Sequence, residues 1–248
     1  MNRVYFEETY HIDSREVDHQ GFCRPSALLG YLQVSATAAA IRLHVANPET
    51  MVKYNSFWML ARIWVELKRP LRWGEELTVR TWHRPPKGPT IYRDFDLYCG
   101  GECVGQAVST WVLADRDTHR LFRMERVEEF AANAGDGLGK TLRLTRVKLP
   151  EGMEEVERRR LYYSELDMNN HVNNTRYADF ACDTLRLESL SGGAFVSQLQ
   201  IGFLAECKAG EELVLYAGQD GEAGLVKGVG PDGKTRFEAS VTVTPGPG

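Results

Sequence analysis

Apolar and polar residues alternate along some stretches of the chain and recur at helical spacing along others, and these two periods predict its elements. Residues 4–12 alternate as in a half-buried strand. Residues 25–44 carry an apolar stripe at the spacing of a helix, and Pro25 suits the first turn of that helix. Long β-type runs follow over residues 57–69, 90–99 and 102–115.

The same order of elements begins again 149 residues later. A strand over 156–164 leads through a polar stretch into an apolar, helix-like run from Tyr177 to Leu187. Glu-Val-Asp at 16–18 matches Glu-Leu-Asp at 165–167, and WGEELTV (73–79) matches AGEELVL (209–215) at the smaller shift of 136 residues. Two matches in the same order predict a duplicated unit of roughly 120 residues.

Each copy therefore combines one helix with a meander of long strands, which predicts an α+β fold in which an antiparallel sheet curls around its helix. We expect an N-terminal domain over residues 1–130 and a C-terminal domain over 146–248. Residues 131–145 connect them as a linker, because the Gly- and Ala-rich sequence there has no strong period.

The polar stretch of the second copy, SELDMNNHVNN at 164–174, contains several side chains that could act in catalysis. Asp167, Asn169 and His171 stand at i, i+2 and i+4, so in an extended segment a carboxylate, an amide and an imidazole share one face. A strand, a polar elbow and a helix would place this set at an active site. An Asn-rich turn that caps a helix is the alternative from spacing alone.

The two copies differ at the positions that carry chemistry. The first copy keeps Asp18 but has Gln20, Phe22, Pro70 and Leu71 where the second has Asn169, His171, Glu206 and Cys207. We therefore predict one catalytic centre, on the second copy, and a first copy that shapes the substrate pocket. The first copy also holds all five tryptophans. Burial in a sheet core is the simpler explanation for them, and a substrate tunnel near Trp58 is the more specific alternative.

Composition narrows the class of protein. The net charge of −4 gives no bulk attraction to nucleic acid, and no run approaches the ~20 apolar residues of a membrane span. Five scattered cysteines suit a reducing compartment, and we expect neither a metal nor a cofactor. The N-terminus shows no signal or transit pattern, so a cytoplasmic location is expected.

The chain resembles the acyl-acyl carrier protein thioesterases of plant plastids and their bacterial relatives. The most specific part is LDMNNHVNNTRYADF (166–180), supported by the Glu206-Cys207 pair in 201–213 and by 64–77 and 109–115. The chain departs from the plastid members in lacking a transit pattern, which implies a bacterial protein or a trimmed chain. The resemblance implies two tandem hotdog domains, each a long helix wrapped by an antiparallel sheet, with an acyl-chain pocket in the first domain. It also implies hydrolysis of fatty acyl-acyl carrier protein to free fatty acid, the step that ends fatty acid chain elongation.

The resemblance implies a catalytic set of Asp167, Asn169, His171, Glu206 and Cys207. Glu206 would act as general base, His171 would orient water or donate toward the thioester oxygen, and Asn169 would bind the carbonyl or fix the histidine. Asp167 would support the loop or interact with the start of the following helix. Cys207 offers a rival covalent scheme, but adjacent strand residues point to opposite faces, which favours Glu206.

The sequence is also compatible with other activities. An acyl-CoA thioesterase, a hotdog-type hydratase or dehydratase, and a passive acyl-binding module are the alternatives, and the retained polar set argues against the last. An acidic carrier protein would need a local basic surface, for which Arg158, Arg159 and Arg160 with Arg143, Arg146 and Lys148 are candidates. A solvated strand edge explains them equally well. The duplication makes the chain a pseudo-dimer, and a homodimer of whole chains stays open.

Overall fold

The computed structural model of the protein describes residues 5–132 and 142–246. The chain packs into two units that interleave along the sequence. Unit 1 comprises Met1–His11, Gly30–Ile63 and Glu75–Leu144, and unit 2 comprises Ile12–Leu29, Trp64–Gly74 and Thr145–Gly248. The elbow and helix start of the first copy therefore pack with the second copy's residues.

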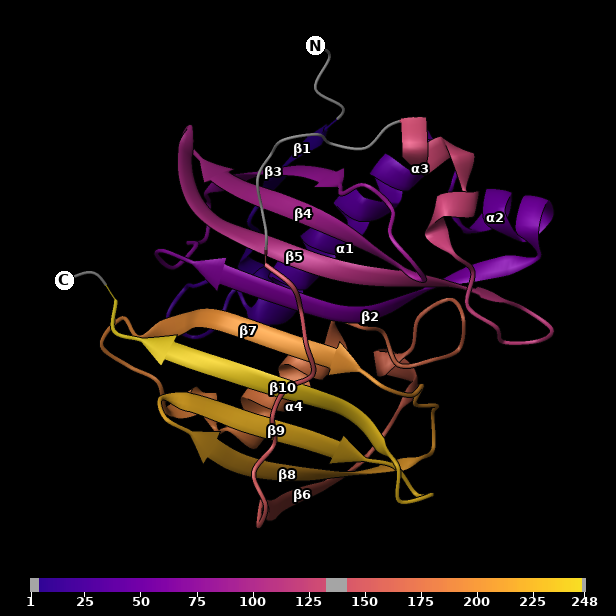
Figure 1. Ribbon diagram of the computed structural model, residues 1–248. Helices are drawn as coiled ribbons and strands as arrows, with labels where there is room; N and C mark the ends of the chain where they lie inside the picture. The colour runs from indigo at the N-terminus through magenta and orange to yellow at the C-terminus, as the bar shows by residue number, and fades with distance from the viewer. Residues whose placement is uncertain (1–4, 133–141, 247–248) are drawn as a thin grey trace. The chain divides into compact units, whose positions relative to one another are not determined.

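Unit 1 is an antiparallel sheet with helices (Figure 1). Its strand order is β1-β3-β4-β5-β2. The strands are β1 (Phe6–His11), β2 (Ser56–Leu67, of which unit 1 holds the first part), β3 (Glu76–His83), β4 (Thr90–Cys99) and β5 (Glu102–Asp115). The helices are α1 (Pro25–Arg42, from Gly30 on in this unit), α2 (Asn47–Tyr54) and α3 (Glu128–Ala132).

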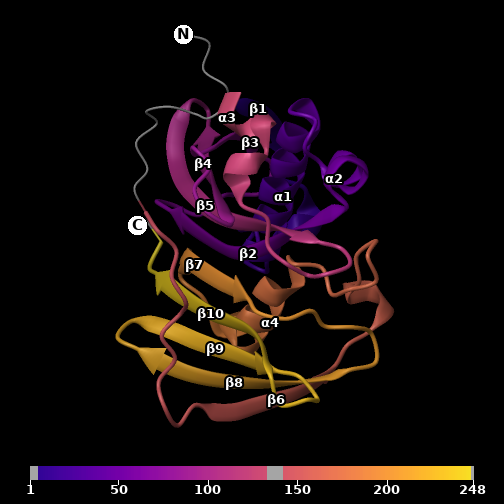
Figure 2. The ribbon, with the colours of Figure 1, turned by 45° about the vertical axis from the view of Figure 1, so that its right-hand side comes forward.

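Helix α1 lies on one face of this sheet, as Figures 1 and 2 show together. Its buried stripe includes Leu32, Ala36 and Ala39, so the predicted apolar face is the packed face. Tyr10 of β1 stacks on Tyr31 with ring centroids 4.8 Å apart, and its hydroxyl lies 2.8 Å from that of Ser35. The aromatic pair and the hydroxyl bond tie the helix to the sheet edge.

A second apolar cluster lies under α2 and α3. Val45, Ile91, Leu113 and Phe130 are buried there, and Trp58 packs edge-on against Phe130 at 5.7 Å. The Trp58 indole N–H donates to the carbonyl of Val45 at 2.7 Å, so its polar atom is satisfied. Trp58 is partly buried and packs against this cluster, which agrees with the core explanation and leaves the tunnel a prediction.

His83, at the end of β3, is a buried histidine against the ring of Phe130. Burial lowers its pKa to about 4, and the nearby Arg93 guanidinium acts in the same direction. Nδ1 lies 3.1 Å from the Arg84 carbonyl, while Nε2 is buried with no hydrogen-bond partner among the described residues. A second proton on the ring would have no acceptor, so the folded protein keeps this imidazole neutral.

The buried neutral histidine predicts acid sensitivity. Because the folded pKa lies below the unfolded value of about 6.5, the unfolded chain binds the proton first, and stability is lost as the pH falls from about 6.5 to about 4. The loss amounts to roughly 3 kcal/mol of unfolding free energy. We expect His83→Gln to remove most of this loss in urea unfolding curves measured from pH 8 to pH 4. Parallel pH profiles for both proteins would contradict the assignment.

Unit 2 is a second antiparallel sheet, of order β7-β10-β9-β8-β6. The strands are β6 (Glu154–Arg160), β7 (Phe195–Phe203), β8 (Glu212–Asp220), β9 (Ala223–Val229) and β10 (Thr235–Thr244). Helix α4 (Arg176–Thr184) covers one face, where the Tyr177 ring packs edge-on against Phe203 at 5.5 Å and Phe237 at 5.1 Å.

The segment that follows the linker crosses the other face of this sheet (Figure 1). Gln200 donates to the carbonyl of Thr145 at 2.8 Å, and the buried carboxylate of Glu238 accepts from the backbone N–H of Val147 at 2.9 Å. Arg146 pairs with the same carboxylate at 3.1 Å, which compensates the buried charge. Residues 133–141 of the predicted linker lie outside the described residues.

The second helix is shorter than its sequence pattern predicts. The apolar run extends from Tyr177 to Leu187, but helix α4 has only nine residues, Arg176–Thr184. Leu187–Ser189 form a separate 3-10 turn. The predicted strand over 156–164 ends at Arg160, because Tyr163–Glu165 also form a 3-10 turn. No helix of the described residues combines the length and apolarity needed to cross a membrane.

Candidate active site

The polar stretch of the second copy folds as a tight turn. One carboxylate oxygen of Asp167 accepts from the backbone N–H of Asn169 at 2.8 Å and from that of His171 at 3.3 Å. The backbone N–H of Asp167 donates to the carbonyl of His171 at 2.8 Å, and Asn170 takes the left-handed conformation with φ 62°. The extended arrangement predicted for 167–171 is therefore wrong, because an Asp side chain that bonds its own backbone stabilises a turn instead.

The turn places the imidazole of His171 next to the carboxylate of Glu206. His171 Nε2 lies 3.2 Å from Glu206 Oε2, and the two side chains are 29% and 53% exposed. The backbone N–H of Val172 donates to the carbonyl of Cys207 at 2.9 Å. Because these two residues directly follow His171 and Glu206, this bond holds the imidazole and the carboxylate in register.

Cys207 points the other way. Cys207 is fully buried, while its neighbour Glu206 is exposed. Strand β7 ends at Phe203, so the strand alternation expected from the sequence does not reach these residues, and packing alone separates the two side chains. Burial raises the pKa of its thiol, which lies beside the Tyr177 hydroxyl. A neutral, enclosed thiol is a poor nucleophile, so the geometry favours the carboxylate of Glu206 as the reactive group.

Asn169 and Asp167 have different surroundings. Asn169 is exposed, and its side-chain nitrogen makes one long contact of 3.4 Å with Asp167. The Asp167 carboxylate accepts hydrogen bonds from the backbone of the turn, which agrees with the first of the two roles considered for it, support of the loop. The site thus presents an exposed amide near a paired imidazole and carboxylate, groups that can bind a carbonyl oxygen and move a proton.

The first copy reproduces this turn bond for bond. The Asp18 carboxylate accepts from the backbone N–H groups of Gln20 at 2.8 Å and Phe22 at 3.0 Å, and Gly21, with φ 78°, takes the place of Asn170. The backbone N–H of Cys23 donates to the carbonyl of Leu71 at 2.8 Å, as that of Val172 does to Cys207. The two turns therefore share one set of backbone contacts, as the predicted duplication requires. Phe22, Pro70 and Leu71 stand where the second copy has His171, Glu206 and Cys207.

Glu165 and its counterpart Glu16 also stabilise the two turns, a role that was not predicted from the sequence. The Glu165 carboxylate accepts from the backbone N–H of Tyr162 at 2.7 Å, and Glu16 does the same for Asp13 at 2.7 Å. Both glutamates also accept, through their carbonyls, the N–H of the residue that closes the turn. The shared Glu-x-Asp sequence was the available signal for this capping role.

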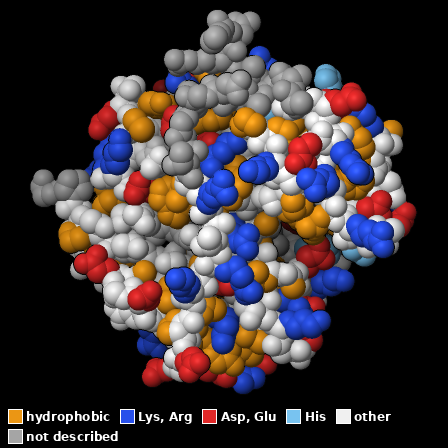
Figure 3. Space-filling view, viewed as in Figure 1, with side chains coloured by type: hydrophobic (Ala, Val, Ile, Leu, Met, Phe, Trp, Pro, Cys, Tyr) orange, Lys and Arg blue, Asp and Glu red, His pale blue; other side chains and the backbone are white. Residues whose placement is uncertain are grey.

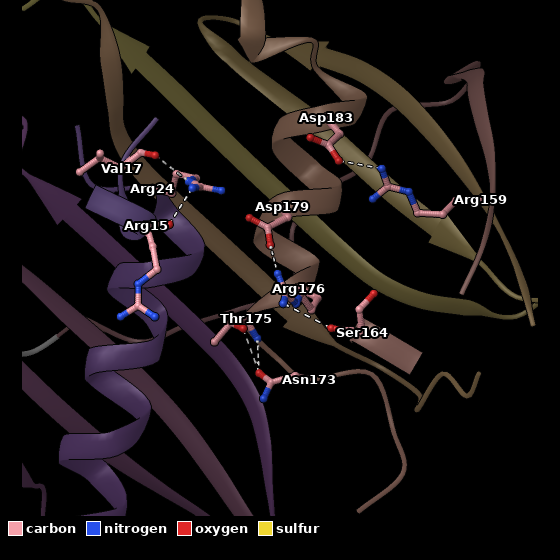
Figure 4. Close-up of polar contacts among 10 residues, drawn as sticks. All are labelled: Arg15, Val17, Arg24, Arg159, Ser164, Asn173, Thr175, Arg176, Asp179 and Asp183. Carbon is pink, nitrogen blue, oxygen red and sulfur yellow. Dashed lines mark hydrogen bonds and ion pairs between the residues drawn. The ribbon is translucent and has the colours of Figure 1, made fainter. Parts of the chain in front are cut away.

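The start of α4 carries its own polar contacts, which Figure 4 shows. The side chain of Asn173 accepts from the backbone N–H and the hydroxyl of Thr175, both at 3.0 Å. Arg176 donates to Asp179 at 3.2 Å and to the carbonyl of Ser164 at 3.3 Å. These bonds join the helix start to the segment that precedes the turn, and Arg176 and Tyr177 were not recognised from sequence as part of this framework.

Three of the six candidate docking cations form ion pairs within unit 2. Arg158 contacts Glu155 and Glu212, Arg159 contacts Glu157 and Asp183, and Arg146 contacts Glu238. Figure 3 shows Lys and Arg side chains over the outer face of the unit 2 sheet with Asp and Glu side chains among them. Pairing weakens the basic field of this surface, so the docking surface stays a prediction. The described part of the chain also shows no group of three or more His, Cys, Asp or Glu that could hold a metal ion.

Comparison with known proteins assigns the chain to a family. The acyl-ACP thioesterase N-terminal domain matches residues 3–133, and the acyl-ACP thioesterase C-terminal domain matches residues 151–229. The chain therefore belongs to the acyl-ACP thioesterase family.

Curated relatives carry the same family name. A chloroplastic palmitoyl-acyl carrier protein thioesterase of Gossypium hirsutum is 28% identical over 228 residues, which cover 86% of this chain and 54% of the relative. A chloroplastic oleoyl-acyl carrier protein thioesterase of Coriandrum sativum is 27% identical over 58% of this chain and 42% of its own length. The chain spans about half the length of the curated relatives it matches.

Solved structures share the fold. An acyl-ACP thioesterase from Bacteroides thetaiotaomicron has a TM-score of 0.86 at 20% identity, with 97% of this chain and 98% of that chain covered. The 12:0-ACP thioesterase from Umbellularia californica has a TM-score of 0.85 at 20% identity, with 99% of both chains covered. These similarities confirm the predicted α+β hotdog fold over nearly the whole chain.

Proposed function

We propose that the protein is a thioester hydrolase that converts fatty acyl-acyl carrier protein into free fatty acid and carrier protein. The observation that carries the proposal is the His171 Nε2 to Glu206 Oε2 contact of 3.2 Å, built on a turn that the first copy repeats without either group. The family to which the chain belongs gives the substrate class.

The groups present account for each step of hydrolysis. The carboxylate of Glu206 takes a proton from a water molecule, whose oxygen then forms a bond to the thioester carbon. His171 holds the carboxylate in place through its 3.2 Å contact, and the exposed Asn169 amide donates to the developing oxyanion. The intermediate collapses as the carbon–sulfur bond breaks, and the proton held by Glu206 passes to the departing sulfur. The products are one fatty acid and one thiol.

Asp167 acts in this scheme as a positioning residue. Its carboxylate bonds the backbone N–H groups of Asn169 and His171, so it fixes the two residues that face the substrate and does not itself reach the reacting atoms. The Cys207 thiol remains beneath the site as a packed side chain.

Thiol release tests the proposal. Purified protein is incubated with acyl-carrier protein and acyl-CoA substrates of graded chain length, and free thiol is measured together with the mass of the acyl product. We expect free thiol and fatty acid in equal amounts, formed faster from the carrier-protein substrates. A hydratase would change the acyl mass by one water without thiol, and a binding module would change neither. Either result would overturn the proposal, while faster release from acyl-CoA would replace only the substrate class.

A further inference from the structure

Unit 2 contains a cavity of about 540 Å³ that the proposed mechanism does not use. Its lining comes from the first copy's turn and the start of α1, from the end of β2, and from the α4–β7 segment. Phe22, Pro70 and Leu71 are among the lining residues, and these occupy the positions that His171, Glu206 and Cys207 hold in the second copy. The cavity therefore lies at the first copy's counterpart of the candidate active site.

The interior of the cavity is apolar. Phe22, Leu71, Phe195 and Leu199 line it and are each at least nine-tenths buried. Two thiols complete the wall, those of Cys23 and Cys182. Burial raises the pKa of each to about 12, so both are neutral and behave as small apolar groups. A volume of this size and lining is typical of a site for a small apolar ligand.

The charged residues around the cavity are already engaged. Asp179 pairs with Arg176 at 3.2 Å and Asp183 with Arg159 at 2.7 Å, as Figure 4 shows. The guanidinium of Arg24 donates to the carbonyls of Val17 at 3.0 Å and Arg15 at 2.7 Å.

The remaining polar lining does not favour an anion either. The Asp18 carboxylate bonds the backbone of its turn, and His19 Nε2 lies 2.9 Å from the carbonyl of Leu190. Glu188 adds an exposed negative charge. Among the described lining residues, acidic groups outnumber the single arginine. A carboxylate head group would meet carboxylates here, whereas a neutral head group would not.

We propose that this cavity is a second, non-catalytic binding site for one unbranched alkyl chain with an uncharged head group, such as a fatty alcohol. The Asp18 turn and the bond from Cys23 to Leu71 preserve the frame of an acyl site, while Phe22, Pro70 and Leu71 replace the groups that could react. Each methylene buried in the cavity should raise the affinity about fourfold. This inference rests on the cavity and the duplication and not on the thioesterase activity.

The two cavity cysteines provide a direct assay with the whole chain. Labelling of each cysteine by methyl methanethiosulfonate is followed by peptide mass mapping at pH 8, with and without 1-decanol or decanoate. We expect 1-decanol to slow the labelling of Cys23 and Cys182 at least tenfold and to leave Cys103, on β5 of unit 1, unchanged. Decanoate should protect at least tenfold more weakly at equal concentration. No protection, equal slowing of Cys103, or equal protection by decanoate would overturn the proposal.

A cavity-filling variant gives the second arm. Cys182→Phe should abolish protection of Cys23 by 1-decanol, with Cys103→Phe as the matched enlargement outside the cavity. The longest acyl chain hydrolysed should be the same in both variants and in the unmodified protein. A shorter limit in Cys182→Phe alone would show that the cavity holds the acyl chain of the reaction, which would overturn a non-catalytic site. If Cys182→Phe does not fold, labelling of the unmodified protein still tests the proposed site.

Discussion

Replacing His171 with alanine is expected to lower kcat/KM for hydrolysis of the fatty acyl-acyl carrier protein thioester by about 10²–10⁴-fold. This is the range for a group that assists proton transfer. The imidazole is the partner that holds the Glu206 carboxylate, at 3.2 Å, and alanine leaves that carboxylate without it. The fold should survive, because the turn is held by Asp167 and by the Val172 to Cys207 backbone bond, none of which involves the imidazole ring. Steady-state kinetics with thermal melting of the same samples measures both quantities.

A histidine outside the site provides the matched control. His11 lies at the exposed end of β1 in unit 1, and His11→Ala should keep activity within twofold to threefold of the unmodified protein. If His171→Ala turned over substrate as fast as His11→Ala, the imidazole would have no part in the reaction. A fall in melting temperature that parallels the loss of activity would instead assign His171 a structural role.

Substitutions at the neighbouring residues Glu206 and Cys207 distinguish general-base catalysis from covalent catalysis. Glu206→Gln keeps the size and hydrogen bonding of the side chain but cannot take a proton, so we expect a loss of about 10²–10⁴-fold in kcat. Cys207→Ser should retain a substantial fraction of kcat, because the thiol is fully buried and faces away from the Glu206 carboxylate. Serine places a hydroxyl in that buried position, which should cost about 1–3 kcal/mol of unfolding free energy.

The opposite ranking would replace the water mechanism by a covalent one. Greater loss in Cys207→Ser than in Glu206→Gln, or an acyl group found on Cys207 by intact mass after a rapid quench, would assign the thiol as nucleophile. Burial raises the pKa of this thiol, so a covalent mechanism would also require the site to open and deprotonate it. Thermal melting of Cys207→Ser separates a loss of stability from a loss of chemistry.

Sequence alone determined the features that depend on neighbouring residues. The periods of apolar residues located the strands and the first helix, since each element buries one face. The duplication was visible because each copy needs the same turn residues: an Asp to bond the backbone, as Asp18 and Asp167 do, and a residue that tolerates positive φ, as Gly21 and Asn170 do. The family was visible for the same reason, since its motif is one continuous segment.

Tertiary structure decided what depends on residues far apart in the chain. Spacing predicted that the side chains of Asp167 and His171 would share one face of an extended segment, but the Asp167 carboxylate bonds the backbone and forms a turn. The pairing of His171 with Glu206 depends on a backbone bond between Val172 and Cys207, which no local pattern reports. The burial of Cys207 follows from packing around Tyr177 and likewise has no local signal.

The cavity at the first copy's turn is a tertiary feature of the same kind. Its walls come from segments that lie more than a hundred residues apart, and its apolar character arises only when Phe22 and Leu71 meet Phe195 and Leu199. Sequence showed that the first copy had lost the reactive groups. Only packing shows that the space remained, because a cavity is the volume that no side chain of any contributing segment fills.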